Sequence, residues 1–207
     1  MRPLRYMLVF LMLMCAVNLN AREASDFFLD IPNKHLPLLD RNTRLDMVDY
    51  FKAGLMTGTK TGLGGEARIL TEHPRRMLVS VSRDATVEIA LVKAGSDTLV
   101  ALIETVKTPI PDSFITIMNK DFSNPRVIPM PDARMFAEPT KAKVVSASSE
   151  PLMMFVSAGF DPDNNAFIFT NNTLEYYPSA EVPEVAKMLR SQIHGVLKGD
   201  KFVELKK

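Results

Sequence analysis

Two carboxylates three residues apart are the pair in this sequence best spaced for acid–base chemistry. Asp46 and Asp49 lie in a segment with helical apolar spacing, where residues i and i+3 share one helix face. Carboxylates paired in this way can exchange protons with a substrate or bind a cation. Acidic residues near a helix N-terminus are also favoured by the helix dipole, and Arg41 and Arg44 are close enough to neutralise both. We therefore favour a structural role for this pair.

The histidines show no spacing typical of a metal site. His35, His73 and His194 lie far apart, and neither HExxH nor HxH occurs. We expect structural or surface histidines, with no metal and no cofactor. The alternative is an acid-dependent hydrolase or isomerase in which Asp46 and Asp49 act with His73. A deep pocket that gathers these carboxylates with His73 or His194 would favour that enzyme.

Two loops have compositions that superficially resemble ligand-binding motifs. Residues 58–65 are rich in glycine, but they follow a helical pattern and lack the P-loop and dinucleotide-binding spacings. Residues 161–165 contain two aspartates, yet the invariant glycine and the closing glutamate of a calcium loop are absent. No serine has the flanking glycines of a nucleophile elbow. We interpret both loops as connections and expect no catalytic residue in the chain.

Residues 1–21 have the organisation of a secretory signal peptide. Two arginines precede an apolar run at residues 7–17, and a short polar segment ends at Ala21. Because the run is too short to span a bilayer, we expect cleavage after Ala21, a periplasmic or secreted protein, and no membrane span in the remaining chain. Cleavage removes Cys15, the one cysteine, and leaves a cysteine-free mature chain. Loss of the arginines changes the formal charge from +1 to −1, which gives no electrostatic reason to expect a nucleic-acid partner.

Residues 77–118 alternate apolar and polar side chains in short runs separated by turn residues. This period of two is typical of half-buried antiparallel strands. Val87, Ile89 and Leu91 are predicted to face the core, and Glu88 is predicted to face water. Residues 98–106 are more uniformly apolar, which favours a central strand covered on both faces. The segment therefore predicts an antiparallel β-meander.

Helical patterns flank the meander. A helix follows residue 40, with three possible caps, Asp40, Asn42 and Thr43. Its apolar stripe comprises Leu45, Val48, Phe51 and Leu55, with Met47 beside it. A second helix is predicted at residues 179–190, where Ser179 can act as the cap. The chain thus predicts an α+β fold, an antiparallel β-meander sheet with an N-terminal and a C-terminal helix packed against it.

The remaining segments complete this organisation. Residues 123–151 are rich in proline and form an irregular crossing with one helical turn near residues 132–136. A strand pair then encloses the turn at 161–165, and a hairpin at 193–205 ends the chain. Residues 22–207 are predicted to form a single α+β domain, or two lobes that meet near residues 123–151.

Several segments together resemble a known family. They are an opening motif, a glycine loop, part of the meander and a later hairpin, at residues 36–50, 63–65 with 70–71, 105–106 with 112–113, and 160–170 with Tyr176. This set is similar to the domain-of-unknown-function family numbered 3256, of exported proteins in Bacteroidales. An aromatic residue, often tryptophan, closes the family segment occupied here by Asp121-Phe122, and this chain contains no tryptophan. The resemblance implies export and the fold, and it implies no catalytic residue.

These observations favour an exported envelope protein that acts as a non-catalytic binding or assembly module. Its partner would be an unknown envelope protein or a small ligand, and an exposed apolar sheet face would support this interpretation. Asp97-Thr98-Leu99 also has the Asp-Ser/Thr-aliphatic pattern of O-glycan acceptors in exported proteins of Bacteroidota. The pattern lies at a predicted turn, which makes Thr98 a candidate for modification.

Overall fold

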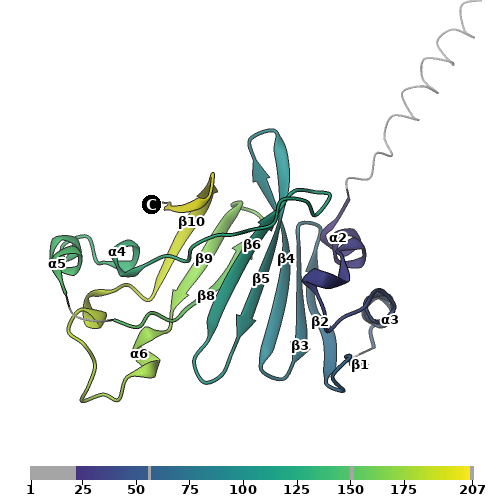
Figure 1. Ribbon diagram of the computed structural model, residues 1–207, viewed down its shortest axis with the longest axis horizontal. Helices are drawn as coiled ribbons and strands as arrows, with labels where there is room; N and C mark the ends of the chain where they lie inside the picture. Colours follow the sequence, from purple (N-terminus) through teal and green to yellow (C-terminus); the bar gives the residue numbers. More distant parts are fainter. Residues whose placement is uncertain (1–21, 56, 150–151, 206–207) are drawn as a thin grey trace, which may run out of the picture.

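The computed structural model describes residues 22–55, 57–149 and 152–205, which form two antiparallel sheets with short helices (Figure 1). The larger sheet has seven strands in sequential order: β1 (Thr59–Lys60), β2 (Glu66–His73), β3 (Arg76–Ser82), β4 (Ala85–Ala94), β5 (Asp97–Val106), β6 (Asp112–Met118) and β7 (Arg126–Val127). The smaller sheet has the order β11-β10-β9-β8 and consists of β8 (Val156–Asp161), β9 (Ala166–Asn171), β10 (Gln192–Lys198) and β11 (Lys201–Glu204). The predicted α+β meander is confirmed.

Short helices precede the large sheet, connect the two sheets and connect β9 to β10. The first group is α2 (Ala24–Asp30), the 3-10 turn η1 (Asn33–His35) and α3 (Arg41–Lys52). The later ones are α4 (Ala133–Phe136), α5 (Ala142–Ala147), α6 (Thr173–Tyr176) and the 3-10 turn η2 (Ala186–Met188). Of the three candidate caps of α3, the structure uses Asp40, whose carboxylate accepts a hydrogen bond from the Thr43 backbone N–H at 2.8 Å.

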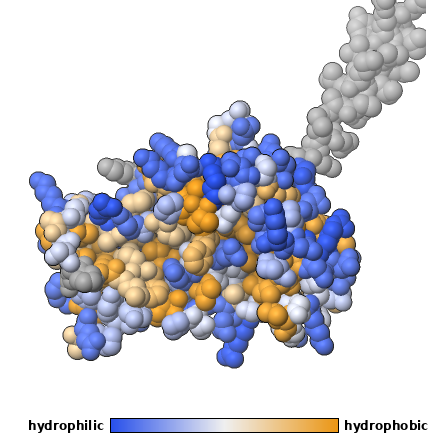
Figure 2. All heavy atoms as spheres, viewed as in Figure 1, coloured by the Kyte–Doolittle hydropathy of each residue, from blue (hydrophilic) through white to orange (hydrophobic). Residues whose placement is uncertain are grey.

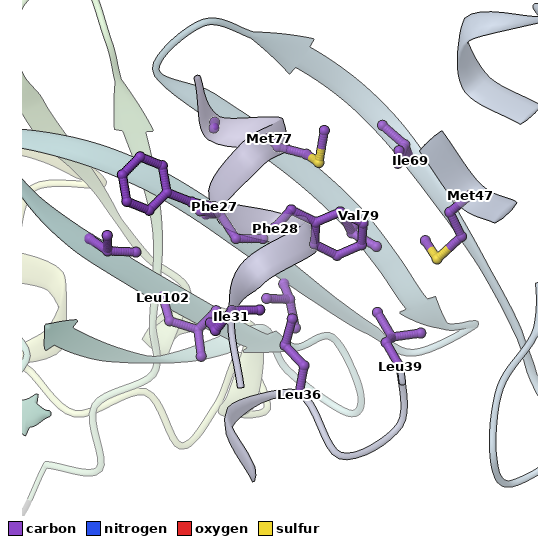
Figure 3. Packing of buried hydrophobic residues seen from close by; sticks show 14 of the residues in the cluster. Phe27, Phe28, Ile31, Leu36, Leu39, Met47, Ile69, Met77, Val79 and Leu102 are labelled. Atoms are coloured by element: carbon purple, nitrogen blue, oxygen red, sulfur yellow. The ribbon is translucent and has the colours of Figure 1, made fainter. Parts of the chain in front are cut away.

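The first core lies between the N-terminal helices and one face of the large sheet. Phe28, Leu39 and Met47 pack against alternate residues of β2 to β5 (Figure 3). The inward residues of β4 are Val87, Ile89 and Leu91, as the alternation predicts. Figure 1 shows α2 and α3 beside β2 and β3, at one side of this sheet.

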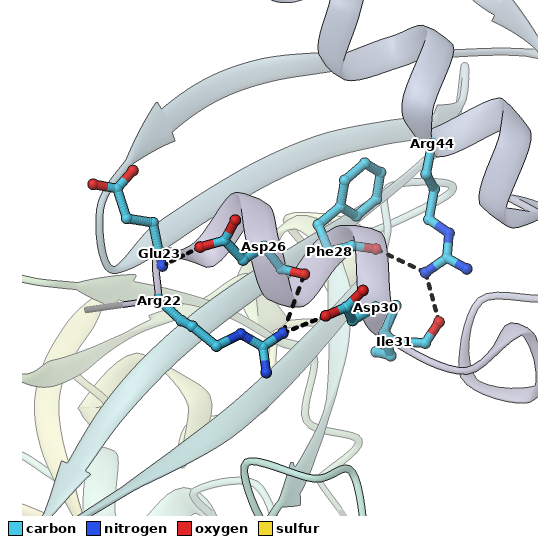
Figure 4. A network of polar contacts seen from close by, with 7 residues as sticks. All are labelled: Arg22, Glu23, Asp26, Phe28, Asp30, Ile31 and Arg44. Carbon is cyan, nitrogen blue, oxygen red and sulfur yellow. Dashed lines mark hydrogen bonds and ion pairs between the residues drawn. The ribbon is translucent and has the colours of Figure 1, made fainter. Parts of the chain in front are cut away.

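Arg44 joins the two N-terminal helices and, among the described residues, forms no ion pair with a carboxylate. Its guanidinium is buried and donates hydrogen bonds to the carbonyl oxygens of Phe28 at 2.7 Å and Ile31 at 2.6 Å (Figure 4). It also donates to the Asn33 side-chain oxygen at 2.7 Å. Because the carbonyls at the end of a helix have no intrahelical partner, Arg44 satisfies the C-terminus of α2 and positions it against α3.

The second core lies on the opposite face of the large sheet, where the small sheet packs. Residues of β4, β5 and β6 that point away from the first core pack against an aromatic cluster of the small sheet. The cluster consists of Phe160, Phe167, Phe169 and Phe202. Ring centroids in this cluster are separated by 4.8–6.1 Å. Aromatic pairs at these distances add to the free energy of burial.

The predicted exposure of Glu88 is wrong. Glu88 lies on the second face of β4, as the alternation requires, but the small sheet covers that face and leaves the residue 3% exposed. Its carboxylate accepts hydrogen bonds from the Arg76 guanidinium at 2.9 Å and the Phe160 backbone N–H at 2.8 Å. Burial raises the pKa of Glu88, and these two hydrogen bonds only partly oppose that rise.

Two helical expectations also need correction. Residues 179–190 form no α-helix and contain only the short turn η2. Val185 and Leu189, whose spacing predicted the helix, are nevertheless buried. Here an irregular segment, and not a helix, buries both side chains. The opposite error occurs at α2, a helix that the sequence analysis did not predict.

Candidate binding surface

The residues of the alternative enzyme do not form a common site. Asp46 and Asp49 are exposed on α3, and within the described chain neither carboxylate has a hydrogen-bond or ion-pair partner. His73 ends β2, where its Nδ1 accepts a hydrogen bond from the Arg75 backbone N–H at 3.1 Å. The pocket beside α3, about 210 Å³ in volume, is lined by other residues of α3 and β2, including Met47, Tyr50 and Arg68.

His194 lies elsewhere, on β10 of the small sheet. It lines an open pocket of about 570 Å³ together with Arg190 and Glu204, which form an ion pair. In the ranges that the structure describes, no three histidine, cysteine, aspartate or glutamate side chains are grouped as a metal site would require. Within the same ranges, no helix is long and apolar enough to cross a membrane.

Part of the large sheet, at β5, β6 and β7, carries exposed apolar side chains. The strand registers pair Glu104 of β5 with Phe114 of β6, and Thr116 of β6 with Val127 of β7. Directly paired residues share one face, so these side chains and Val106, two residues after Glu104, lie on the face that α2 and α3 cover elsewhere. We call this set, Glu104, Val106, Phe114, Thr116 and Val127, the β5–β7 face.

Large apolar side chains on the β5–β7 face are open to solvent. Val106 is 49% exposed, Phe114 is 58% exposed and Val127 is 68% exposed. Figure 2 shows apolar atoms gathered across the middle of the molecule, in the region that β5, β6 and the chain leading to α4 occupy in Figure 1. Exposed apolar residues that are scattered singly are normal, whereas adjacent ones on neighbouring strands indicate an interaction surface.

A pocket of about 400 Å³ adjoins this face. Phe114 and Val127 line it together with the chain between β7 and α4 and the chain before β8, including Met130, Pro131 and Met154. Methionine and proline side chains give the pocket an adaptable apolar wall. The pocket and the β5–β7 face therefore form one continuous surface that could accept an apolar side chain from a partner.

Glu104 is the charged member of the β5–β7 face. Its cross-strand neighbours are Val87 of β4 and Phe114 of β6. The carboxylate has no hydrogen-bond or ion-pair partner among the described residues. The side chain reaches solvent, but its apolar neighbours displace enough water to raise the pKa of Glu104.

Thr98 occupies the hairpin end predicted for it. It is the second residue of β5, is half-buried and pairs with Lys93, and Asp97 before it is exposed. Asp97, Thr98 and Leu99 line an open depression with Asn119, Lys120 and Asp121. The O-glycan at Thr98 remains a prediction.

Sequence reasoning anticipated the strands of the binding surface but not its exposure. Residues 98–106 were expected to be covered on both faces, but only their central part, Val100 to Ile103, is buried on both. Which part of a sheet a helix covers depends on how far the helix extends, and the pattern of a strand does not encode that length.

The family profile described as "Protein of unknown function (DUF3256)" matches residues 16–202, most of the chain. The chain belongs to the DUF3256 family. The resemblance noted in the sequence is thereby confirmed, and the family description assigns no activity.

A solved structure has the same fold as this DUF3256 member. It is titled "Structure of a domain of an uncharacterized protein from Porphyromonas gingivalis W83", and the two chains superpose with a TM-score of 0.67. The match covers 89% of this chain and 100% of the other, at 19% sequence identity. At that identity the similarity establishes the fold alone. No curated protein matches the chain.

Proposed function

We propose that this protein is a non-catalytic binding module of the cell envelope, which binds a partner protein through the β5–β7 face. The observation that carries the proposal is the exposure of Val106, Phe114 and Val127 on three neighbouring strands, next to an apolar pocket. Interfaces concentrate their binding energy in a few large side chains that fill pockets, and Phe114 beside the 400 Å³ pocket has that arrangement. The signal-peptide pattern of residues 1–21 supports the envelope location.

The enzyme alternative has no comparable support. Asp46 and Asp49 are exposed on α3. His73 accepts a hydrogen bond from the Arg75 backbone N–H, within the turn that follows β2. His194 lines a different pocket, with Arg190 and Glu204. A pair of carboxylates open to water has no enclosure that would exclude water from a substrate.

The test is a quantitative comparison of partners recovered after chemical crosslinking in the native envelope. The face variant combines Phe114→Ser with Val127→Ser. The control variant combines Leu55→Ser with Leu63→Ser, which removes two exposed apolar side chains from a different part of the surface. We expect a partner whose recovery falls by about tenfold with the face variant, as loss of an interface anchor predicts, and is unchanged with the control. Equal recovery with both variants would refute the proposal.

A further inference from the structure

The carboxylate of Glu104 restricts which partner can cover the β5–β7 face. Paired residues on adjacent antiparallel strands have Cβ atoms about 4.5–5.5 Å apart, so a partner that covers Phe114 also covers Glu104. Covering the carboxylate removes its remaining water. A buried carboxylate is strongly unfavourable unless an opposite charge or several hydrogen-bond donors replace that water.

The residues that the structure describes do not supply that opposite charge on this face. At the surrounding register positions Val87, Leu102, Val106, Phe114 and Thr116 are uncharged, and Asp112, which pairs with Val106, is an acid. The other carboxylates near the pocket already have donors, since Asp112 accepts from the Val156 backbone N–H and Asp132 pairs with Arg134. Glu104 therefore differs from them in having acceptor capacity that no described residue uses.

We propose that the β5–β7 face takes a segment of a partner protein in which a lysine or arginine is flanked by apolar side chains, and that Glu104 binds the cation. This deepens the proposed function and rests on it. The apolar flanks would contact Val106, Phe114 and Val127, which lie on three adjacent strands and span about 10 Å across the sheet. Charge complementarity of this kind sets the register and the choice of partner.

A protein segment suits this surface better than a lipid does. Glu104 is the one carboxylate of the face to which no described residue donates, and it lies among apolar side chains from neighbouring strands. This arrangement matches a peptide with a single basic residue between apolar ones. A membrane surface would instead be attracted by clusters of basic residues, and the face presents an acid.

The experiment measures binding of three short peptides to the purified protein by NMR: acetylated and amidated Leu-Lys-Leu, Leu-Gln-Leu and Leu-Glu-Leu. We expect the lysine peptide to shift the signals of Phe114 and Val127 and to bind about threefold to tenfold tighter than the glutamine peptide. Glu104→Gln should abolish this preference. The matched control Glu72→Gln removes an exposed carboxylate from β2 and should preserve it.

A second measurement follows the Glu104 carboxylate itself in the wild-type protein. Its NMR-detected pKa should fall when the lysine peptide is added, because a nearby cation stabilises the charged form. A rise in that pKa, with Glu104→Gln binding as tightly as wild type, would mean that Glu104 is covered in its protonated form, and would overturn the inference.

The remaining outcomes separate this inference from the proposed function. Equal shifts at Phe114 with the lysine and glutamine peptides would refute the cation preference and leave an apolar binding face. No shift on the face with any peptide would also overturn the inference, while the crosslinking comparison independently decides the binding role. Binding of phosphatidylethanolamine vesicles through the same residues, in place of the peptides, would assign the face to a lipid.

Discussion

The Glu88 carboxylate of β4 accepts a hydrogen bond from the Phe160 backbone N–H of β8 at 2.8 Å, and so links the two sheets. Two further side chains of the large sheet do the same at alternate positions of β8. Asp112 accepts from the Val156 N–H and Ser113 accepts from the Ala158 N–H, each at 3.0 Å. An exposed strand edge can pair with other chains, and these acceptors occupy the edge of β8 instead. The small sheet is therefore attached through backbone amides as well as through its aromatic core.

Removing the Glu88 side chain should destabilise the protein strongly. Glu88→Ala leaves the Phe160 N–H without an acceptor at a buried site and removes the partner of the partly exposed Arg76 guanidinium, and a buried group left without its partner costs about 1–3 kcal/mol. Ile89→Ala, on the opposite face, should cost about 2–4 kcal/mol through loss of packing. Chemical denaturation measures both values. Surface substitutions usually change the free energy of unfolding by less than about 0.5 kcal/mol. A cost that small for Glu88→Ala would contradict the role of Glu88 in linking the two sheets.

The raised pKa of Glu88 predicts a specific pH dependence. Because the folded state holds this proton more tightly than the unfolded state does, the stability that the group contributes is fully present below its unfolded pKa. That contribution is lost as the pH rises through the folded pKa. The free energy of unfolding of the wild type, relative to Glu88→Gln, should therefore fall as the pH rises above about 4.5. A relative gain in stability over that range would show that Arg76 and the Phe160 N–H dominate and lower the pKa.

Export should produce a chain that begins at Arg22. In the structure the Arg22 guanidinium contacts the Asp30 carboxylate at 2.6 Å (Figure 4), and Ala24 is buried. Intact mass and N-terminal sequencing of protein from the envelope fraction should identify Arg22 as the first residue. A cytoplasmic protein that retains Met1 would contradict export.

Thr98 should carry an O-linked glycan in the native host. Glycopeptide mass spectrometry should find the modification on the wild type, lose it in Thr98→Ala and recover it in Thr98→Ser, which retains a hydroxyl. Asp97 is exposed at the end of the β4–β5 hairpin, so an enzyme can approach the acceptor pattern from solvent. A wild-type peptide that contains only unmodified Thr98 would end this idea.

Local patterns predicted the strands well, because a period of two identifies which side chains share a face. Val87, Ile89 and Leu91 are buried as that pattern requires. The same pattern cannot distinguish water from a second layer of protein on the other face, and this is why Glu88 was placed in solvent. The exposed Phe114 is the converse case, an apolar residue on a face whose covering helices end before they reach it.

Helix prediction failed where spacing and backbone chemistry disagree. Val185 and Leu189 have helical spacing, but Pro178 and Pro183 limit the hydrogen bonds available nearby. The missed helix α2 did have a signal. Glu23 and Asp26 form a reciprocal capping box, and Phe27 and Phe28 supply the buried face. The binding surface had no comparable local signal, because its exposure depends on tertiary coverage.

The central claim, that the β5–β7 face binds a partner, is tested most directly by a photo-crosslinking residue at position 127. Val127 is replaced by p-benzoylphenylalanine in the native host, and Leu63, an exposed apolar residue beside β2, is replaced in a control strain. Irradiation should give a discrete adduct from position 127 that Phe114→Ser removes, and none from position 63. The same adduct from both positions, or none from position 127, would contradict the account.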